Sequence, residues 1–324
     1  MNSDKQAQYF GSFSGKKFGQ NSERRVEQQD KNKIYSEGVV LSLSEAIEEY
    51  TLMAKVEGRA EKTLNLYDYV LGRFTDFLSE DFVIDEIDSS QIREYLSKLM
   101  DEGLKNTSVA IHHRVIKAFF NWLVEEGYLD YPPTDRVKEP KTPKKYPRYL
   151  DEVQVNTFLK ASKREMNTWA DYRNHTIMIS FLDMGLRLNE LVTAKLNDLS
   201  FDNRSLKVHG KGAKDRLVFF GVRTYKTLRH WLKIRDKKGV VLDETLFITE
   251  RGERLKKRYV QHIVTDLQEA AGLEEIKLSP HVLRHTAATM AVKNGMDPFT
   301  LKRIFGWEQI ETALRYIHLS EKSL

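Results

Sequence analysis

Two histidines and an arginine stand at the start of a small, apolar, helix-like segment near the C-terminus. In SPHVLRHTAATMAVKNG, Ser279 suits a helix N-cap and Pro280 the first helical position. Side chains three and four residues apart share a helix face, so we expect His281, Arg284 and His285 to point roughly the same way. Backbone N–H groups at a helix start, an arginine fork and imidazole donors together suit an anion such as phosphate.

Two other interpretations of this segment remain open. Histidines at i and i+4 form a zinc-ligand pair, but the metalloprotease version has Glu after the first histidine, and here that position is Val282. The sequence contains no cysteine, and Arg284 would place a fixed cation between the two ligands. A histidine near a helix start can also serve only in capping or packing, and this helix by itself does not decide between a structural and a functional role.

Three further segments carry residues whose side chains could take part in catalysis or binding. DMGLRLNELVTAKLNDL has Arg187 at the end of an apolar stretch and Glu190 three residues on. HGKGAKDRLVFF has Lys211 between two glycines, and IFGWEQIETALRYIHLS has Trp307 and Tyr316. Each has an ordinary explanation by itself, such as a helical ion pair or a core aromatic residue. The GKG tripeptide fails the phosphate-loop template G-x-x-x-x-G-K-[ST], which argues against nucleotide binding.

Together and in order, these boxes resemble the tyrosine recombinases, also called the phage-integrase family. That family has Arg in a G-L-R-x-x-E-L box, Lys on a β-hairpin, an H-x-x-R-H box, His or Trp, and then Tyr. This chain reads GLRLNEL, GKGAKDR, HVLRH, FGW and RY. The resemblance covers 150–324, and the helical region 40–130 is similar to the family's SAM-like core-binding domain.

The resemblance implies a role for each residue in DNA phosphodiester cleavage. Tyr316 would be the nucleophile and form a 3′-phosphotyrosyl link, with nearby cations helping a phenol of ordinary pKa about 10 to ionise. Arg187 and Arg284 would clamp the non-bridging oxygens, since they are permanent bidentate donors. Lys211 would protonate the 5′-hydroxyl leaving group.

The remaining site residues receive supporting roles or a proton-accepting role. The helix dipole disfavours a charged imidazole at His281, which would stay neutral and accept the tyrosine proton. His285 is expected to be a supporting residue of the site, and Glu190 is expected to hold Arg187 in position. Trp307 stands where many members have His, and an indole cannot exchange a proton near neutral pH. It would donate one N–H to phosphate and pack the helix of the nucleophile.

These residues must be positioned by a chain of 324 residues, which is long enough for two cores. Residues 1–38 are polar and are interpreted as a flexible basic tail. Four amphipathic patterns follow between 39 and 130, the first with a capping-box pair at Ser42 and Glu45, and they predict a small α-helical bundle. This bundle is the expected DNA-binding core domain.

The composition changes at 131–149, which holds five of the seven prolines. Such density opposes a regular helix or central strand and predicts an extended linker. Its positive charge suits a phosphate backbone, although a merely solvated tether remains the alternative. The expected DNA-binding side chains are Lys141, Lys144, Lys145 and Arg148.

Residues 150–324 are expected to form a mainly helical α+β catalytic domain with a small antiparallel sheet. Helices are predicted at about 151–164, 170–185, 222–236 and 256–271, and after Ser279. SLKVHG and RLVFF, joined through GKGAKD, predict a hairpin, and TLFIT is a candidate for another strand.

The sequence therefore predicts a site-specific DNA recombinase of the simple, two-domain, Xer-like or mobile-element type. It would act through a phosphotyrosine and a Holliday junction as a homotetramer on an inverted-repeat core site in double-stranded DNA. A net charge of +5 agrees with a polyanionic partner. No metal, cofactor, nucleotide or membrane is expected, and the cytoplasm is the expected compartment. Two alternatives are a type IB topoisomerase, which would relax any plasmid, and a catalytically silent DNA-binding protein of the same fold.

Overall fold

The computed structural model describes residues 41–79, 82–143, 146–164, 166–210, 215–237 and 243–321. The chain divides into two compact units, with the division between positions 144 and 145. The predicted tail at 1–38 lies outside the described residues. In the described part, no helix is both long and apolar enough to cross a membrane.

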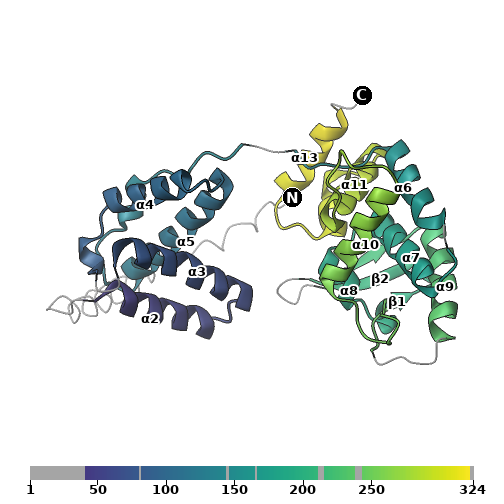
Figure 1. The fold of residues 1–324 in the computed structure, drawn as a ribbon, viewed down its shortest axis with the longest axis horizontal. Coiled ribbons are helices and arrows are strands. Elements are labelled where there is room, and N and C mark those ends of the chain that lie inside the picture. The colour runs from purple at the N-terminus through teal and green to yellow at the C-terminus, as the bar shows by residue number, and fades with distance from the viewer. Residues whose placement is uncertain are drawn as a thin grey trace, which may run out of the picture. The chain divides into compact units, whose positions relative to one another are not determined.

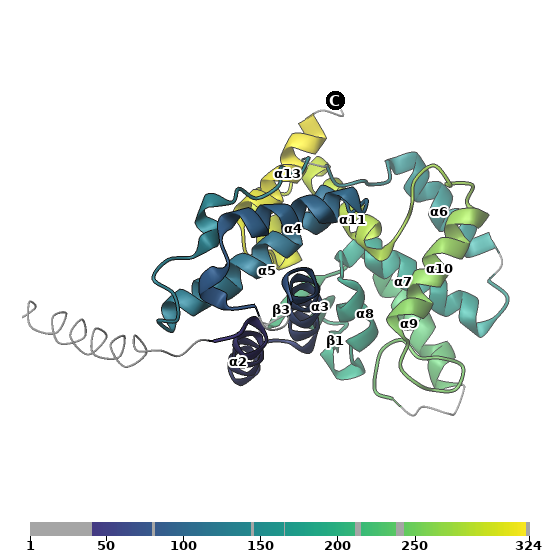
Figure 2. The same ribbon diagram turned by 60° about the vertical axis from the view of Figure 1, so that its left-hand side comes forward.

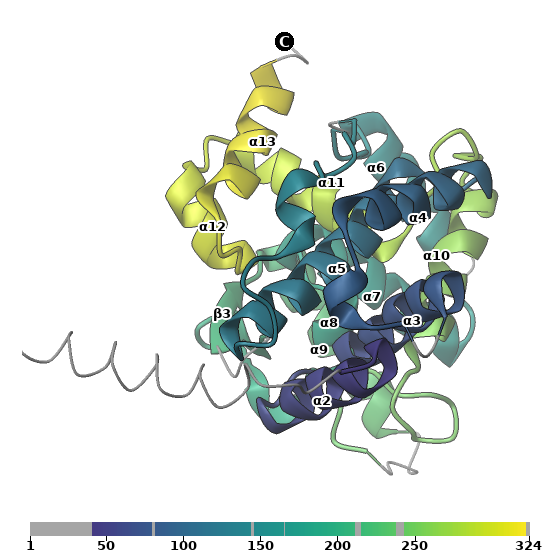
Figure 3. The ribbon, with the colours of Figure 1, turned by 90° about the vertical axis from the view of Figure 1, so that its left-hand side faces the viewer.

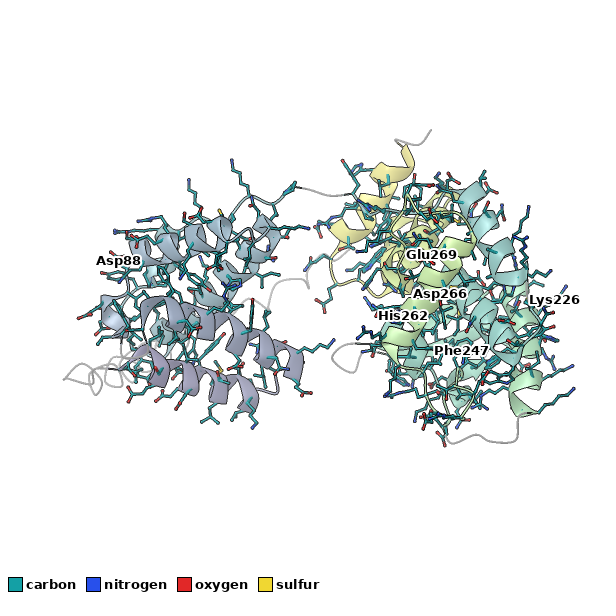
Figure 4. All side chains as sticks on the ribbon, viewed as in Figure 1. Asp88, Lys226, Phe247, His262, Asp266 and Glu269 are labelled. Atoms are coloured by element: carbon teal, nitrogen blue, oxygen red, sulfur yellow. The ribbon has the colours of Figure 1, made fainter. Side chains whose placement is uncertain are left out.

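The described part of the first unit is a bundle of α-helices joined by short turns (Figures 1 and 2). The Ser42 and Glu45 capping box is present, with the Ser42 N–H donating to Glu45 Oε2 at 3.0 Å. Asp88 caps a later helix in the same way (Figure 4). The four α-helices are α2 (Leu43–Val56), α3 (Glu61–Leu78), α4 (Ser89–Asp101) and α5 (Asn106–Glu125).

The core of this unit is rich in aromatic rings that pack edge to face. Tyr50 of α2 meets Phe119 of α5 with ring centroids 5.5 Å apart, and Phe74 of α3 meets Tyr95 of α4 at 5.1 Å. Burial of such large side chains on one stripe of each helix stabilises the bundle.

The first part of the predicted linker packs on the first unit. Pro133–Arg136 forms a 3₁₀ turn, η2, and the side chain of Val137 is buried in the helical core. Glu139 pairs with Arg114 of α5. On the other side of the division, Leu150 is fully buried in the second unit and its N–H donates to Thr286 Oγ1 at 2.9 Å. The proline-rich segment is thus held at both ends.

The second unit is mainly helical with one small sheet, as the sequence predicts. The sheet has the order β1-β2-β3 and is antiparallel, with Ser205 opposite Phe219 and His209 opposite Asp215. The predicted hairpin is therefore formed by β2 and β3, while its tip at 211–214 lies outside the described residues. The strands are β1 (Leu199–Ser200), β2 (Ser205–His209) and β3 (Asp215–Phe219).

The third candidate strand, TLFIT at 245–249, is not a strand of this sheet, whose remaining strand is the unpredicted β1. Thr245 and Ile248 make only isolated bridges, to Lys195 and Arg254. The backbone of this segment instead accepts hydrogen bonds from buried side chains. The indole N–H of Trp231, for example, donates to Leu246 O at 2.9 Å. The apolar residues of TLFIT therefore indicate burial in the core and not a strand of the sheet. Phe247 of this segment is labelled in Figure 4.

Helix α7 is buried along most of its length, because α6, α9 and α11 pack on it. Gly185, in the left-handed conformation at φ +59°, ends α7. On α10, the exposed face carries His262, Asp266 and Glu269 (Figure 4). The larger helices are α6 (Glu152–Arg164), α7 (Trp169–Met184), α9 (Val222–Asp236), α10 (Lys257–Ala270) and α11 (Pro280–Lys293), and the short ones are α8 (Leu188–Thr193) and η3 (Leu196–Asp198).

Two further helices, α12 (Pro298–Phe305) and α13 (Ile310–Glu321), pack on α11 and on each other (Figure 3). The small residues Ala287 and Ala288 of α11 lie in the apolar cluster that all three helices share. Helix α12 was not predicted, although Asp297 and Pro298 form an N-cap pair: Asp297 Oδ1 accepts from the Phe299 N–H at 3.0 Å. This three-helix layer brings the C-terminal residues to the candidate site.

Candidate functional site

The junction between α7 and α8 presents the first arginine. After Gly185 ends α7, Arg187 becomes the N-cap of α8 and Glu190 its third residue. The Glu190 carboxylate accepts the Arg187 backbone N–H at 2.7 Å and its Nη1 at 2.9 Å. Arg187 therefore begins a new helix instead of ending the apolar one, and the R-x-x-E spacing is half of a capping box.

Glu190 is a buried carboxylate shared between two arginines. Its oxygens also accept Nη1 and Nη2 of Arg216, from β3, at 2.6 and 2.9 Å. Burial alone would raise the pKa of Glu190, but the hydrogen bonds and charge of Arg216, followed by those of Arg187, outweigh it and lower the pKa. The carboxylate stays ionised and fixes both guanidinium groups.

The C-terminal end of α12 supplies a second set of acceptors. Three consecutive carbonyls there each accept from a different arginine: Ile304 O from Arg216 Nε at 2.7 Å, Phe305 O from Arg284 Nη2, and Gly306 O from Arg187 Nη2 at 2.6 Å. The last carbonyls of a helix lack intrahelical partners and carry the negative end of its dipole. The end of α12 thus gathers the three cations.

Arg284 lies deepest in this group. It comes from α11, is 4% exposed, and donates through Nη1 to Gly185 O as well as to Phe305 O. Burial, together with repulsion from Arg187, lowers the pKa of Arg284 to about 9, so the group is still a cation at neutral pH. Its plane also lies over the Phe305 and Trp307 rings, 5.1 and 5.8 Å from their centroids.

Arg187 has the most accessible guanidinium of the three. Its side chain is 37% exposed, against 12% for Arg216 and 5% for Arg284. Toward described residues it uses two of the five N–H donors of an arginine. It is therefore able to bind an anion without giving up its protein contacts.

The two glycines of this region are required by close packing. A Cβ on Gly185 would lie 2.5 Å from the Phe305 ring, and one on Gly306 would lie 3.0 Å from the Arg216 side chain. Gly306 also has φ +61°, which L side chains rarely adopt. The G of GLR and the G of FGW therefore let the arginine-bearing segments approach one another.

The imidazole that contacts Tyr316 is that of His285. Its Nδ1 lies within hydrogen-bonding distance of the Tyr316 hydroxyl. Burial, with the nearby charge of His281 and Arg284, lowers the pKa of His285 to about 4, so the ring is neutral at pH 7 and can accept a hydrogen bond from the Tyr316 hydroxyl. His281 lies one turn earlier on α11, exposed, with its ring centroid 6.5 Å from that of His285. The i, i+4 spacing does place both rings on one face.

Tyr316 is closed off in this structure. It is 2% exposed and stacks on Trp307 with centroids 5.0 Å apart and planes 5° from parallel. Burial raises the pKa of Tyr316 to about 12, even though Arg284 acts in the opposite direction. The phenol is therefore protonated and shielded here, and Trp307 packs against it as an aromatic cover.

The structure does not test every residue that the sequence singles out. Lys211, Lys144 and Lys145 lie outside the described residues. Lys141 and Arg148 are both exposed, the first in the part of the linker that follows η2 and the second shortly before α6. Their side chains are free to face solvent or a partner.

Sequence reasoning missed Arg216. The residue stands in the quoted GKGAKDRLVFF, and a strand alternates its faces, so Arg216 shares the inward face with buried Val218. An arginine at an inward strand position demands a buried acceptor. That signal was available, but only the tertiary structure identifies Glu190 as the acceptor.

The cluster combines three arginines with one carboxylate, which leaves an excess of positive charge in a largely buried place. Such an excess, next to a neutral imidazole and a phenol, fits an oxyanion with several acceptor oxygens, and a phosphodiester is one. Among the described residues no group of three His, Asp or Glu side chains could hold a metal ion.

Family models match both units. The model described as the phage integrase family matches residues 148–323, and that described as the phage integrase N-terminal SAM-like domain matches 47–127. The chain is 32% identical over 270 residues to the tyrosine recombinase XerC of Corynebacterium glutamicum, covering 83% of this chain and 85% of that protein. It is 29% identical over 285 residues to the tyrosine recombinase XerD of Staphylococcus aureus, covering 86% and 95%.

Solved structures show the same fold. A crystal structure of the XerH site-specific recombinase bound to palindromic difH substrate, a post-cleavage complex, has a TM-score of 0.72 at 22% identity and covers 86% of this chain and 81% of that one. A lambda integrase dimer bound to a COC′ core site has a TM-score of 0.67 at 18% identity, covering 92% and 87%.

Proposed function

The chain belongs to the phage integrase family of tyrosine recombinases, and on that basis we propose that it cuts and rejoins DNA at a defined site. It is a site-specific DNA recombinase, and its partner is double-stranded DNA. The observation that carries this conclusion is the meeting of three separate segments of the second unit near the end of α12. They carry Arg187, the neighbours Arg284 and His285 of α11, and Tyr316 of α13.

The chemical step assigns one task to each group. The Tyr316 oxygen attacks a DNA phosphorus, the new bond is a 3′-phosphotyrosyl ester, and the bond from phosphorus to the 5′ oxygen breaks. Arg187 and Arg284 bind the non-bridging oxygens, whose charge grows in the transition state. Lys211 gives a proton to the leaving 5′ oxygen. Because the ester keeps the energy of the broken bond, religation through a Holliday junction needs no nucleotide.

The two histidines share the handling of the phenolic proton. His285 already contacts the Tyr316 hydroxyl in its closed position and is neutral. His281 is exposed at the start of α11, one turn before His285. We assign His281 as the proton acceptor when Tyr316 has moved onto a phosphate, and His285 as its partner in the closed state.

DNA binding must open the site around Tyr316. Tyr316 and Arg284 are 2% and 4% exposed, too little for either to contact a phosphate, so Trp307 or α13 has to move first. Trp307 has no exchangeable proton near neutral pH, and its task is to pack the phenol and to donate its indole N–H. The closed state protects the nucleophile until DNA is bound.

The assembly on DNA is part of the same proposal. We assign 39–130 as the core-binding domain, 131–149 as a basic linker, 150–324 as the catalytic domain and 1–38 as a tail. Support comes from the relatives: a palindromic substrate, as bound by XerH, presents the same half-site twice. Two such sites would bring together four protomers, hence a homotetramer. With DNA as substrate, the compartment is the cytoplasm.

The covalent intermediate tests this function directly. The protein is incubated with sheared DNA of its source organism, stopped with detergent, and the DNA ends linked to protein are captured and sequenced, with Tyr316→Phe as the matched control. Ends that gather at one or two inverted-repeat sites, and only with Tyr316 present, are expected. Scattered ends would identify a topoisomerase. The absence of any adduct would indicate a catalytically silent DNA-binding protein.

The assignment of Lys211 has its own test. Lys211→Ala is expected to lose cleavage of the recovered site, because an alkoxide leaves poorly without a proton. A substrate with sulfur in place of the bridging 5′ oxygen releases a thiolate, which needs no proton, and should restore the adduct. A variant equally impaired on both substrates would remove Lys211 from this role.

A further inference from the structure

Toward the described residues, Arg216 is the member of the arginine group whose three side-chain nitrogens all donate hydrogen bonds. It comes from the inward face of β3, and its side chain is 12% exposed. Nε donates to Ile304 O at 2.7 Å, and Nη1 and Nη2 donate to the two Glu190 oxygens at 2.6 and 2.9 Å. The planar fork matches the carboxylate in the bidentate arrangement that only arginine provides.

These bonds join two segments that hold the other arginines. Through Glu190, Arg216 fixes the carboxylate that also holds Arg187. Through Ile304 O it fixes the end of α12, whose next carbonyl, Phe305 O, accepts from Arg284. The Arg216 side chain also fills the space beside Gly306, where a Cβ would lie only 3.0 Å away. The Arg216 side chain thus positions both the carboxylate that holds Arg187 and the helix end that holds Arg284.

We propose that Arg216 is a positioning residue for DNA cleavage: without touching the DNA, it holds Glu190 and the end of α12 so that Arg187 and Arg284 meet one phosphate. This inference rests on the proposed recombinase function. Because Arg216 belongs to β3, its hydrogen bonds also join this strand of the sheet to Glu190 and to the end of α12.

A lysine at this position separates geometry from charge. Arg216→Lys keeps the cation but cannot donate to Ile304 O and to both carboxylate oxygens in one plane. We expect the single-turnover rate of covalent adduct formation on the recovered site to fall about 10- to 100-fold, since displacement by about an ångström costs that much. The dissociation constant for the same DNA should change less than about threefold, because Arg216 makes no DNA contact. The matched control is Arg223→Lys, at an exposed position of α9, which should keep the wild-type rate.

The pH profile tests whether Arg216 acts through Glu190. Among the residues that the structure describes, the charged groups that face Glu190 are Arg187, Arg216 and Arg284. Removing Arg216 withdraws the largest influence that lowers the pKa of this buried carboxyl, so its pKa should rise. In Arg216→Met, adduct formation should therefore be lost at a higher pH than in the wild type as the medium is acidified. Adding Glu190→Gln to Arg216→Met should remove this shift, because no carboxylate is left to titrate.

The outcomes separate the inference from the proposed function. If the wild type and Arg223→Lys form no adduct, the recombinase function itself fails. If both form it and Arg216→Lys matches their rate, only the inference fails. A loss in Arg216→Met that is the same at every pH and is unaffected by Glu190→Gln would also overturn it, and so would a loss that merely follows a lower melting temperature in both Arg216 variants.

Discussion

Among its described residues the second unit buries arginines in three places, at Arg173, at Arg235 and in the cluster around Glu190, and only that cluster has the properties of an active site. Arg173 of α7 is 1% exposed and donates to Ile248 O, Asn174 Oδ1 and Tyr259 Oη, with the Trp169 and Tyr259 rings beside it. Arg284 is almost as buried and also donates to backbone carbonyls beside aromatic rings. By burial and hydrogen bonding alone, the two arginines look alike.

The difference lies in the charges around them. Burial lowers the pKa of both, but the positive charges of Arg187 and Arg216 lower that of Arg284 further, whereas the charged carboxylates near Arg173, Glu250 and Asp171, act to raise its pKa. One carboxylate, Glu190, serves all three members of the cluster. A buried cation with satisfied donors is structural, whereas an excess of buried cations awaits an anion.

The largest effect that would sharpen this comparison is that of Arg284→Ala. Removing a donor that acts on the transition-state charge should lower the cleavage rate by about 10³-fold or more. DNA affinity in a mobility-shift assay should stay largely intact, because many other cations bind the backbone. Thermal stability should change little, since the loss of two hydrogen bonds is offset by relief of repulsion. Loss of DNA binding would show that Arg284 serves affinity and not chemistry.

The histidine pair comes next. His281→Ala should slow adduct formation by about 10²-fold, the usual worth of a general base. His285→Ala should cost less than about tenfold, because it partners Tyr316 only in the closed state. Single-turnover rates decide the order. The reverse ranking would make His285, which contacts the hydroxyl in the structure, the catalytic base.

Arg173→Met provides the contrasting case. It should lower the free energy of unfolding by about 1–3 kcal/mol, because Ile248 O and the Tyr259 hydroxyl lose a buried partner. Chemical denaturation measures this loss. Cleavage by the folded fraction at low temperature should equal that of the wild type. A variant that is stable but inactive would break the distinction between the two arginine sites.

Trp307→Phe should have a smaller effect on activity than Arg187→Ala. Phenylalanine keeps a ring to stack on Tyr316 and loses only the indole N–H, so a decrease of about tenfold or less is expected. Arg187→Ala removes the exposed guanidinium of the cluster and should cost at least about 10²-fold. Equal losses in the cleavage rate would give Trp307 a direct part in the chemistry.

The smallest expected effect concerns the linker. Neutralising Lys141, Lys144 and Lys145 should weaken binding to all DNA sequences and reduce the slope of log affinity against log salt by about one unit per lost phosphate contact. The matched control removes the same charges at Lys226, Lys233 and Lys237, exposed positions at and just after α9 (Lys226 is labelled in Figure 4). An unchanged slope in the linker variant would show that the linker is a solvated tether that does not contact DNA.

Local patterns were sufficient to predict most elements of the fold. The 3.6-residue periodicity and the caps at Ser42 and Ser279 predict helices that the structure contains, and the alternation around the GKG tripeptide predicts β2 and β3. TLFIT was harder, because a short apolar run signals burial without distinguishing a strand from a buried loop. Helix α12 was missed because it spans only eight residues, about two turns, which is too short to show a helical period.

By itself, the sequence determined the family, the two-unit organisation of its motifs and the types of residue in the site, because ordered boxes at fixed positions carry that information. Only the tertiary structure decided which side chains meet. It brought Arg216 to Glu190, put three arginines on three successive carbonyls of α12, and placed His285 against a buried Tyr316. Those contacts join residues far apart along the chain, and helix packing, which no local pattern encodes, sets their distances.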